Sequence, residues 1–278
     1  MIVLSDIHTH THFCDGKNSP RQMLERAVEM GLYSYGFSGH APVDLDGMEC
    51  DWAMTKENEA KYFAEITSLK AELADKIIVN CGCEMDAFSP IPTNAYDYLI
   101  GSVHYVLGRG GYVEVDRSPE YVKMGVEGYF GGSLDAYAEA YFALLSTIKK
   151  KTDCDVVGHV DLVTKFNEKD VSLAGAFCPE NKKYRDAALD CVNELLGDCI
   201  FEINTGAMSR GYRSAPYPAP FILEHIAKKG GRVTITGDTH HADNICFKAD
   251  MAREYARACG VKSHWVLGKN GSFSEYEL

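Results

Sequence analysis

Long apolar runs, proline and positive charge are all scarce in this chain of 278 residues. No segment approaches the ~18 consecutive apolar residues that span a bilayer, and the first residues show no basic stretch followed by an apolar one. We therefore expect a cytoplasmic protein without a membrane segment. The 9 prolines and the ordinary 46% of hydrophobic residues exclude collagen-like, low-complexity and disordered chains.

Basic residues are outnumbered: 28 Lys and Arg stand against 40 Asp and Glu, a formal net charge of −12. This sign does not suit neutralising a phosphate backbone over a long footprint, so no nucleic-acid partner is expected. The ten cysteines fall mainly within apolar runs, and Cys81-x-Cys83 lacks the spacing and the second pair of a zinc knuckle. We expect reduced, buried thiols with no part in the chemistry.

Short β-rich runs alternate with longer amphipathic stretches, which favours an α/β fold with a parallel sheet and the strand count of a barrel. Seven strands are predicted at 2–6, 34–38, 77–83, 98–103, 155–157, 199–203 and 233–236, and a run at 265–267 could add another. Helices are predicted at 20–30, 57–76, 134–151, 181–196, 220–229 and 242–259. No linker divides the chain, so residues 1–278 are expected to form a single domain.

One segment breaks this rhythm. Residues 105–133 are rich in Gly and Tyr and show no clear period. Long irregular segments in compact domains are usually lids or binding loops. We expect an irregular insertion over one end of the barrel, whose role the sequence does not reveal.

Almost every predicted strand ends in a residue that can bind a metal. The residues at six of these ends are His8, His10, His40, Glu84, His104, His159, Asp238, His240 and His241. The carboxyl ends of the strands converge on one face of a parallel barrel, so sequence scatter becomes spatial clustering. In His8-x-His10 the i, i+2 spacing places both imidazoles on one side of a strand. A lone histidine is ordinary, but six coincidences predict a metal site.

Ordered motifs over nearly the whole chain resemble those of the polymerase-and-histidinol-phosphatase (PHP) superfamily. They are His8-Thr-His10-Thr-His12-Phe-Cys-Asp15-Gly16, Gly39-His40, Glu84, Ser102-Val-His104, Gly158-His159-Val-Asp161 and Gly237-Asp238-Thr-His240. The segments Phe13-Cys-Asp15-Gly16 and Glu202-Ile-Asn204-Thr205 look most like the histidinol-phosphate phosphatases of that superfamily. The resemblance implies a distorted seven-stranded (β/α)7 barrel, similar to a TIM barrel, with a trinuclear metal centre.

The same resemblance implies a set of ligands for each ion. One ion would be held by His8, His10, Glu84 and Asp238. Glu84 would bridge to a second ion held by His104 and His159, and a third would be held by Asp15, His40 and His240. Nitrogen and oxygen donors without thiolate fit zinc, manganese or iron. We therefore expect two to three divalent metal ions as cofactors.

Such a centre supports phosphate-ester hydrolysis. Two ions about 3.5–4 Å apart can share one water, lower its pKa to near neutrality and present hydroxide to phosphorus. The resemblance implies hydrolysis of L-histidinol phosphate to L-histidinol and phosphate in histidine biosynthesis, by a metal-bridging hydroxide. Two alternatives stay open. One is another small phosphate ester, such as a nucleotide, a sugar phosphate or phosphotyrosine; the other is a catalytically silent metal-binding domain.

Residues for the substrate are harder to select. Arg210 and Arg213, in the loop after the sixth strand, can offer guanidinium groups to phosphate, and Arg117 in the insertion is a third candidate. His12 lies just beyond the first strand and could line the substrate pocket. The departing alkoxide could be protonated by Asp238, by His241 or by a metal-bound water. The sequence predicts a small phosphorylated substrate as partner and no particular oligomeric state.

Overall fold

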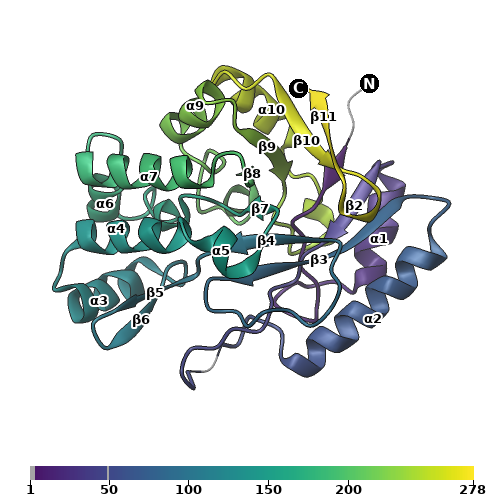
Figure 1. Cartoon of the computed structure of the whole chain (residues 1–278), viewed down its shortest axis with the longest axis horizontal. Helices are drawn as coiled ribbons and strands as arrows, with labels where there is room; N and C mark the ends of the chain where they lie inside the picture. Colours follow the sequence, from purple (N-terminus) through teal and green to yellow (C-terminus); the bar gives the residue numbers. More distant parts are fainter. Residues whose placement is uncertain (1–3, 49) are drawn as a thin grey trace.

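The computed structural model describes residues 4–48 and 50–278 (Figure 1). Its centre is a seven-stranded sheet in the order β1-β2-β3-β4-β7-β8-β9, in which every neighbouring pair is parallel. The strands are β1 (Ser5–Asp6), β2 (Ser34–Phe37), β3 (Ile78–Asp86), β4 (Tyr98–Ser102), β7 (Val156–Val157), β8 (Ile200–Asn204) and β9 (Arg232–Thr236). Each matches a predicted strand to within a few residues, although Ile2 and Val3 lie outside the described residues.

The sheet curls until its first and last strands meet just beyond their carboxyl ends. The His10 N–H donates to the Thr239 carbonyl at 2.8 Å, and the Thr239 N–H donates to the His8 carbonyl at 2.8 Å. These bonds form a parallel bridge between Thr9 and Thr239. The predicted seven-stranded, nearly closed parallel barrel is therefore confirmed. The further run at 265–267 forms β10 (Ser263–Leu267), which pairs antiparallel with β11 (Phe273–Glu277) rather than joining the barrel.

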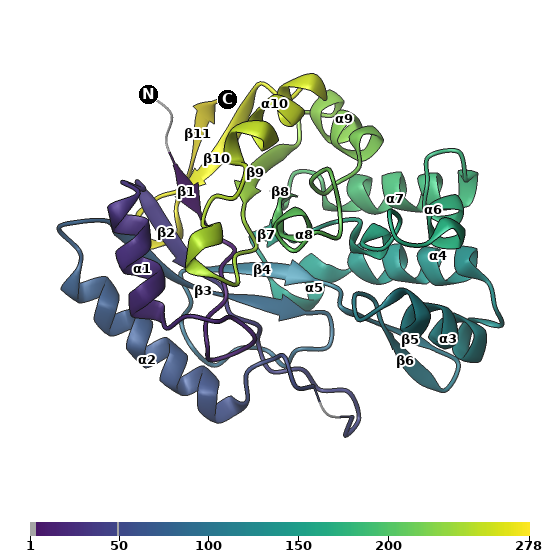
Figure 2. The same ribbon diagram turned by 180° about the vertical axis from the view of Figure 1, so that it is seen from behind.

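Helices surround the barrel, and the view from behind in Figure 2 places α1 and α2 beside β1 to β3. The helices are α1 (Pro20–Glu29), α2 (Lys56–Glu72), α3 (Pro119–Phe130), α4 (Leu134–Leu145), α5 (Ile148–Thr152), α6 (Val171–Ala176), α7 (Lys182–Leu195), α8 (Gly206–Ser209), α9 (Pro220–Lys228) and α10 (Ala249–Ala258). At the start of α1 the Ser19 side chain accepts from the Gln22 N–H, and the Gln22 side chain accepts from the Ser19 N–H. This capping box satisfies backbone donors that the helix cannot pair internally.

Two predicted helices are shorter than expected. The helix predicted at 134–151 breaks into α4 and α5, because the hydroxyls of Ser146 and Thr147 donate to the carbonyls three residues back and compete with the helical pattern. The helix predicted at 242–259 begins only at Ala249. Cys246 and Lys248 have positive φ angles of 54° and 49°, so the chain before α10 is a short 3-10 turn, Ala242–Asn244, and a loop.

The prediction of an irregular segment at 105–133 was wrong. It contains a hairpin of β5 (Tyr105–Gly108) and β6 (Gly111–Glu114), followed by α3. Arg109 and Gly110 form the two-residue turn, in which Gly110 has a φ of 90°, and Ser118 caps α3. The unit lies alongside α4 (Figure 1) rather than over the barrel end, and it reaches the cavity described below only through Glu114 and Asp116.

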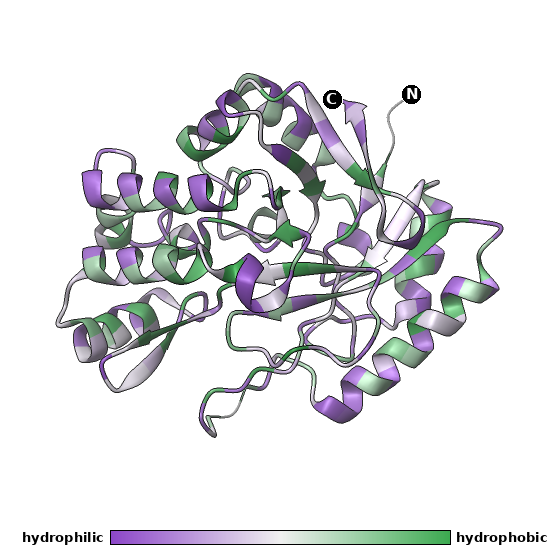
Figure 3. Cartoon of the chain, viewed as in Figure 1, coloured by the Kyte–Doolittle hydropathy of each residue, from purple (hydrophilic) through white to green (hydrophobic). Residues whose placement is uncertain are grey.

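Every residue of β2, β7 and β8 is buried, whereas the outer helices alternate between hydrophobic and hydrophilic residues (Figure 3). Tyr98 fills part of the interior, with its hydroxyl 2.5 Å from the Ile7 carbonyl oxygen and 3.0 Å from that of Phe37. Gly36 leaves room for this ring, since a Cβ there would lie 2.4 Å from the Tyr98 hydroxyl. All ten cysteines are free and six are buried, as predicted. Within the described residues, we find no helix with the length and apolarity needed to cross a membrane.

Candidate metal centre

The nine predicted metal ligands come together at the carboxyl ends of the barrel strands. Glu84 belongs to β3 itself, and the others follow β1, β2, β4, β7 and β9 within a few residues, with Asp15 in the longer loop after β1. Their donor atoms form four groups, in each of which all ligand atoms lie within 4.8 Å of one another. The groups are His8, Glu84 and His159; His8, His10 and Asp238; His40, Glu84 and His104; and His10, Asp15, His40 and His240.

Glu84 lies at the middle of this arrangement and is almost fully buried. Its Oε2 faces His8 Nε2 at 3.0 Å and His40 Nδ1 at 2.9 Å. Its Oε1 faces His159 Nε2 at 3.1 Å and His104 Nε2 at 3.5 Å. A carboxylate with imidazole nitrogens on both oxygens is placed to bridge two ions, which is the role that the resemblance implies.

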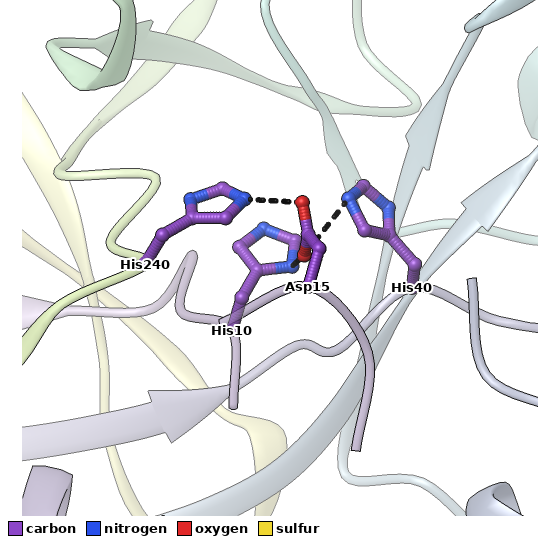
Figure 4. A group of neighbouring side chains, drawn as sticks. All are labelled: His10, Asp15, His40 and His240. Carbon is purple, nitrogen blue, oxygen red and sulfur yellow. Dashed lines mark hydrogen bonds and ion pairs between the residues drawn. The ribbon is translucent and has the colours of Figure 1, made fainter. Parts of the chain in front are cut away.

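The fourth group surrounds Asp15 (Figure 4). Asp15 Oδ2 lies 3.0 Å from His240 Nε2, while Oδ1 lies 3.6 Å from His10 Nδ1 and 3.8 Å from His40 Nε2. The rings of His10 and His240 stack with their centroids 4.1 Å apart. The set therefore includes His10 as well as the three residues that the resemblance implies for a third ion.

Several of the nitrogen and oxygen atoms that could bind a metal ion are buried without a hydrogen-bond partner. They include His8 Nε2, His10 Nε2, Asp15 Oδ1 and Glu84 Oε2. Each buried polar atom left unpaired costs about 1–3 kcal/mol, and opposed lone pairs repel. A cation placed among them removes both costs. The residues present therefore fit a multinuclear metal site of nitrogen and oxygen donors.

The protonation states of three side chains in the site also favour metal binding. Burial alone would raise the pKa of the Glu84 carboxyl, but the facing imidazoles hold it well below its ordinary value. Burial acts on Asp238 in the same way, and the Arg210 guanidinium outweighs it and keeps that pKa low. Burial and two neighbouring imidazoles lower the pKa of His10 to about 3. Ionised carboxylates and a neutral imidazole are the forms that bind metal ions.

A cavity of about 210 Å³ lies over the donors. Besides predicted ligands, it is lined by Trp52, Glu114, Asp116, Leu162, Lys165, Arg210 and Tyr212. Of these seven residues, Arg210 alone is predicted from the sequence, as a group that binds phosphate. Its Nη2 donates to Asp238 Oδ2 at 3.0 Å, and its Nη1 lies 2.8 Å from His240 Nδ1. Arg210 thus connects the predicted metal ligands to the cavity wall.

Lys165 is a second cation in the same wall, and sequence reasoning missed it. It is buried, and its ammonium group donates to Asp116 Oδ2 and to the Asp116 carbonyl, both at 2.9 Å. The signal that could have found it is its position six residues after His159, in a loop that follows a barrel strand. Asp116 comes from the segment read as irregular, where no periodic pattern marks it.

The two other predicted arginines lie outside the residues that line the cavity. The Arg213 guanidinium stacks on the Tyr217 ring at 4.2 Å and donates from Nε to the Ala215 carbonyl at 3.2 Å. Arg117 is exposed and donates to Glu114 Oε2 at 3.2 Å. Its partner lines the cavity, but Arg117 does not.

Two predicted histidines also lie away from the cavity lining. His12 is exposed, and its ring packs on Phe13 with centroids 4.4 Å apart. His241 is 47% exposed, and its Nδ1 accepts from the Asp243 N–H at 3.2 Å. Of the two side chains predicted to protonate a leaving group, the structure brings only Asp238 to the cavity.

With this geometry described, comparison with known proteins places the chain in a family. The family model described as PHP domain matches residues 6–206. The chain belongs to the PHP family. A protein of Deinococcus radiodurans named "Probable histidinol-phosphatase" is 30% identical over 265 residues, covering 91% of this chain and 93% of that protein. The histidinol-phosphatase of Lactococcus lactis subsp. lactis is 26% identical, covering 92% and 91%.

A solved structure of a PHP relative has the same fold. It is the histidinol phosphate phosphatase from Lactococcus lactis, in complex with zinc, L-histidinol and phosphate. It superposes with a TM-score of 0.71 at 22% identity and covers 97% of this chain and 98% of that one. The similarity in fold therefore extends over nearly the whole length of both chains.

Proposed function

We propose that this PHP protein is a metal-dependent phosphomonoesterase that hydrolyses L-histidinol phosphate to L-histidinol and phosphate, a step of histidine biosynthesis. One observation carries the proposal: nine metal-binding side chains converge beneath a cavity whose wall holds two cations, the partly exposed Arg210 and the buried Lys165. The names of the similar proteins, which are histidinol-phosphatases, support the choice of substrate. The zinc, L-histidinol and phosphate in the Lactococcus lactis structure support the chemistry.

We assign the nine ligands to two or three divalent ions, of zinc, manganese or iron. When bound, these ions supply Lewis-acid polarisation of the phosphoryl oxygens and activation of water. The side chains hold the positions that this requires, since Glu84 connects two of the ligand groups and His8 and His10 each belong to two. The positive charge of the ions also offsets the net charge of −12 that would otherwise repel a phosphate ester.

Arg210 and Lys165 bind the phosphoryl group in this proposal. A guanidinium offers several N–H donors in a plane and suits two phosphate oxygens, whereas an ammonium acts as a compact point charge. Both groups already hold fixed positions, because Arg210 is bound to Asp238 and Lys165 to Asp116. Donors that are oriented before the substrate arrives need little reorganisation in the transition state.

Hydrolysis also requires a proton transfer. Water oxygen bonds to phosphorus, the bond from phosphorus to the alkoxide oxygen breaks, and one proton passes from the water to the alkoxide. Of the side chains predicted to take part in proton transfer, the Asp238 carboxylate is the one that lines the cavity. We propose that this carboxylate accepts the proton from water and returns it to the departing alkoxide.

Other residues that line the cavity suit the amino-alcohol part of the substrate. Trp52 presents an aromatic ring, and Glu114 and Asp116 present carboxylates. An ammonium group is stabilised by carboxylates, and an imidazole ring can stack on an aromatic one. This combination favours L-histidinol phosphate over a sugar phosphate, whose sugar has neither an ammonium group nor an aromatic ring.

The proposal is tested by phosphate release from a panel of esters. Purified, metal-replete protein is given L-histidinol phosphate, a sugar phosphate, a nucleoside monophosphate and phosphotyrosine at matched concentrations. We expect kcat/KM for L-histidinol phosphate to exceed that of each other ester by at least ~100-fold, the discrimination that two lost polar contacts provide. A higher kcat/KM on another ester would keep the phosphatase but refute this substrate. No turnover of any ester would indicate a catalytically silent metal-binding protein.

A further inference from the structure

Glu202, on β8, is a buried carboxylate just outside the predicted metal ligands, and both of its oxygens are fully hydrogen-bonded. Oε1 accepts from His8 Nδ1 at 2.5 Å and from the Thr236 hydroxyl at 2.6 Å. Oε2 accepts from the His159 backbone N–H at 2.7 Å and from Asn204 Nδ2 at 2.9 Å. The side chain is 0% exposed, so water cannot replace any of these bonds.

The bond to His8 determines which ring nitrogen is available to a metal ion. Because Glu202 has only acceptor atoms, His8 must carry a hydrogen on Nδ1 to donate to it. The lone pair is then on Nε2, the atom that lies 3.0 Å from Glu84 Oε2 and has no hydrogen-bond partner. Histidine ligands commonly have a carboxylate on the second nitrogen, which fixes both the tautomer and the ring orientation.

The other oxygen of Glu202 acts on a second ligand in the same group. It binds the backbone N–H of His159, whose Nε2 lies 3.1 Å from Glu84 Oε1. His8 and His159 thus face different oxygens of Glu84, and both are hydrogen-bonded to the buried carboxylate of Glu202. The group formed by His8, Glu84 and His159 depends on Glu202 at two of its three members.

We propose that Glu202 is a positioning residue that makes His8 and His159 competent as metal ligands, and that it thereby determines the affinity of the ions that these two histidines hold. Glu202 itself does not touch the ion or the substrate in this account. The inference rests on the metal site of the proposed function but not on the identity of the substrate.

The isosteric variant Glu202→Gln keeps the volume of the side chain but changes its hydrogen bonds, so it tests whether Glu202 orients the histidines or only fills space. An amide has only one acceptor oxygen, so its NH2 group must face one of the two donor pairs. If the NH2 group faces His159 and Asn204, it meets the His159 backbone N–H, which is a donor and cannot become an acceptor. If the NH2 group instead faces His8 and Thr236, both can become acceptors: the Thr236 hydroxyl rotates, and His8 moves its hydrogen from Nδ1 to Nε2. That shift removes the lone pair that faces Glu84, so we expect the variant to fold and to lose a ligand.

The test is a zinc titration of metal-stripped protein, followed by calorimetry and by elemental analysis after dialysis. We expect Glu202→Gln to bind the ions held by His8 and His159 10–100-fold more weakly than the unaltered protein, the range found when such supporting carboxylates are removed. An ion held by His10, Asp15, His40 and His240 should keep its affinity, because that group contains no partner of Glu202.

Asp6→Asn is the matched control. Asp6 is also 0% exposed, and it accepts from the N–H groups of Gly237 and Cys246 and from the Thr239 hydroxyl, at 3.0, 3.1 and 3.0 Å, and more distantly from the His8 backbone N–H at 3.4 Å. It therefore loses a comparable set of buried bonds but contacts no ligand imidazole. We expect Asp6→Asn to lower the thermal unfolding midpoint and to leave the number and affinity of bound zinc ions unchanged.

Two results would overturn the inference: unchanged zinc affinity in Glu202→Gln, or an equal loss of zinc in Asp6→Asn. If Glu202→Gln does not fold, Glu202→Asp takes its place. It keeps the charge but withdraws the oxygens from His8 and His159, so the same ions should bind more weakly, and unchanged binding would again refute the role. An unaltered protein that binds no zinc, manganese or iron would instead refute the metal site of the proposed function.

Discussion

Replacing Glu84 with glutamine is expected to lower kcat/KM for L-histidinol phosphate by about 10⁴-fold, because several kcal/mol of metal-dependent transition-state stabilisation would be lost. The Glu84 carboxylate faces five imidazoles and connects two ligand groups. An amide at this position carries no charge and has only one acceptor oxygen, so it cannot bridge two ions. We therefore expect the metal content to fall together with the activity.

The measurement combines steady-state kinetics with elemental analysis of the same preparations. Asp155→Asn provides the control, since Asp155 accepts from the Leu99 N–H at 2.9 Å but precedes β7 at the opposite end from the metal site. It should keep its metal ions and its kcat. If Glu84→Gln retained full activity, Glu84 could not be the bridging ligand.

The second large effect is expected at Arg210. Arg210→Ala should lower kcat/KM by about 100-fold, since a charge-assisted hydrogen bond contributes about 1.5–3 kcal/mol and each 1.36 kcal/mol is a factor of ten. The bound metal should stay, because Arg210 donates to Asp238 and His240 from the cavity side and is not itself a ligand. Kinetics on L-histidinol phosphate and elemental analysis distinguish these two effects.

Arg213→Ala is the matched control for this arginine. The two residues lie three positions apart in one loop, but Arg213 stacks on Tyr217 and does not line the cavity. We expect its removal to lower the stability of the fold and to leave KM unchanged. Equal losses of kcat/KM in Arg210→Ala and Arg213→Ala would show that neither effect reflects phosphate binding at the cavity. Loss of metal from Arg210→Ala would show that its main role is to hold Asp238.

The parts of the fold that the sequence predicts are those with a strong local signal. The seven barrel strands are short, apolar and separated by amphipathic helices, and the convergence of parallel strand ends brings residues as distant as His8 and Asp238 into one group. Helix ends with clear caps, as at Ser19, also follow from the sequence. Breaks caused by single residues do not, as the chain around Ser146 and before Ala249 shows.

The features that the sequence could not predict depend on contacts between distant loops. Lys165 and Asp116 form an ion pair that joins two such loops in the cavity wall. Nothing local distinguishes Arg210, which faces the cavity, from Arg213, which packs on Tyr217. Glu202 is visible in a motif, but its role appears only when His8 and His159 are seen on its two oxygens.

The central claim is that phosphate-ester hydrolysis at this cavity depends on the metal ions held by the nine converging side chains. Its most direct test uses one preparation in three states: as purified with metal, after stripping with a chelator, and after return of zinc, manganese or iron. Phosphate release from L-histidinol phosphate and metal content are measured in each state. The account predicts that stripping abolishes turnover and that at least one of these metals restores it. Full turnover by protein shown to contain no metal would contradict it.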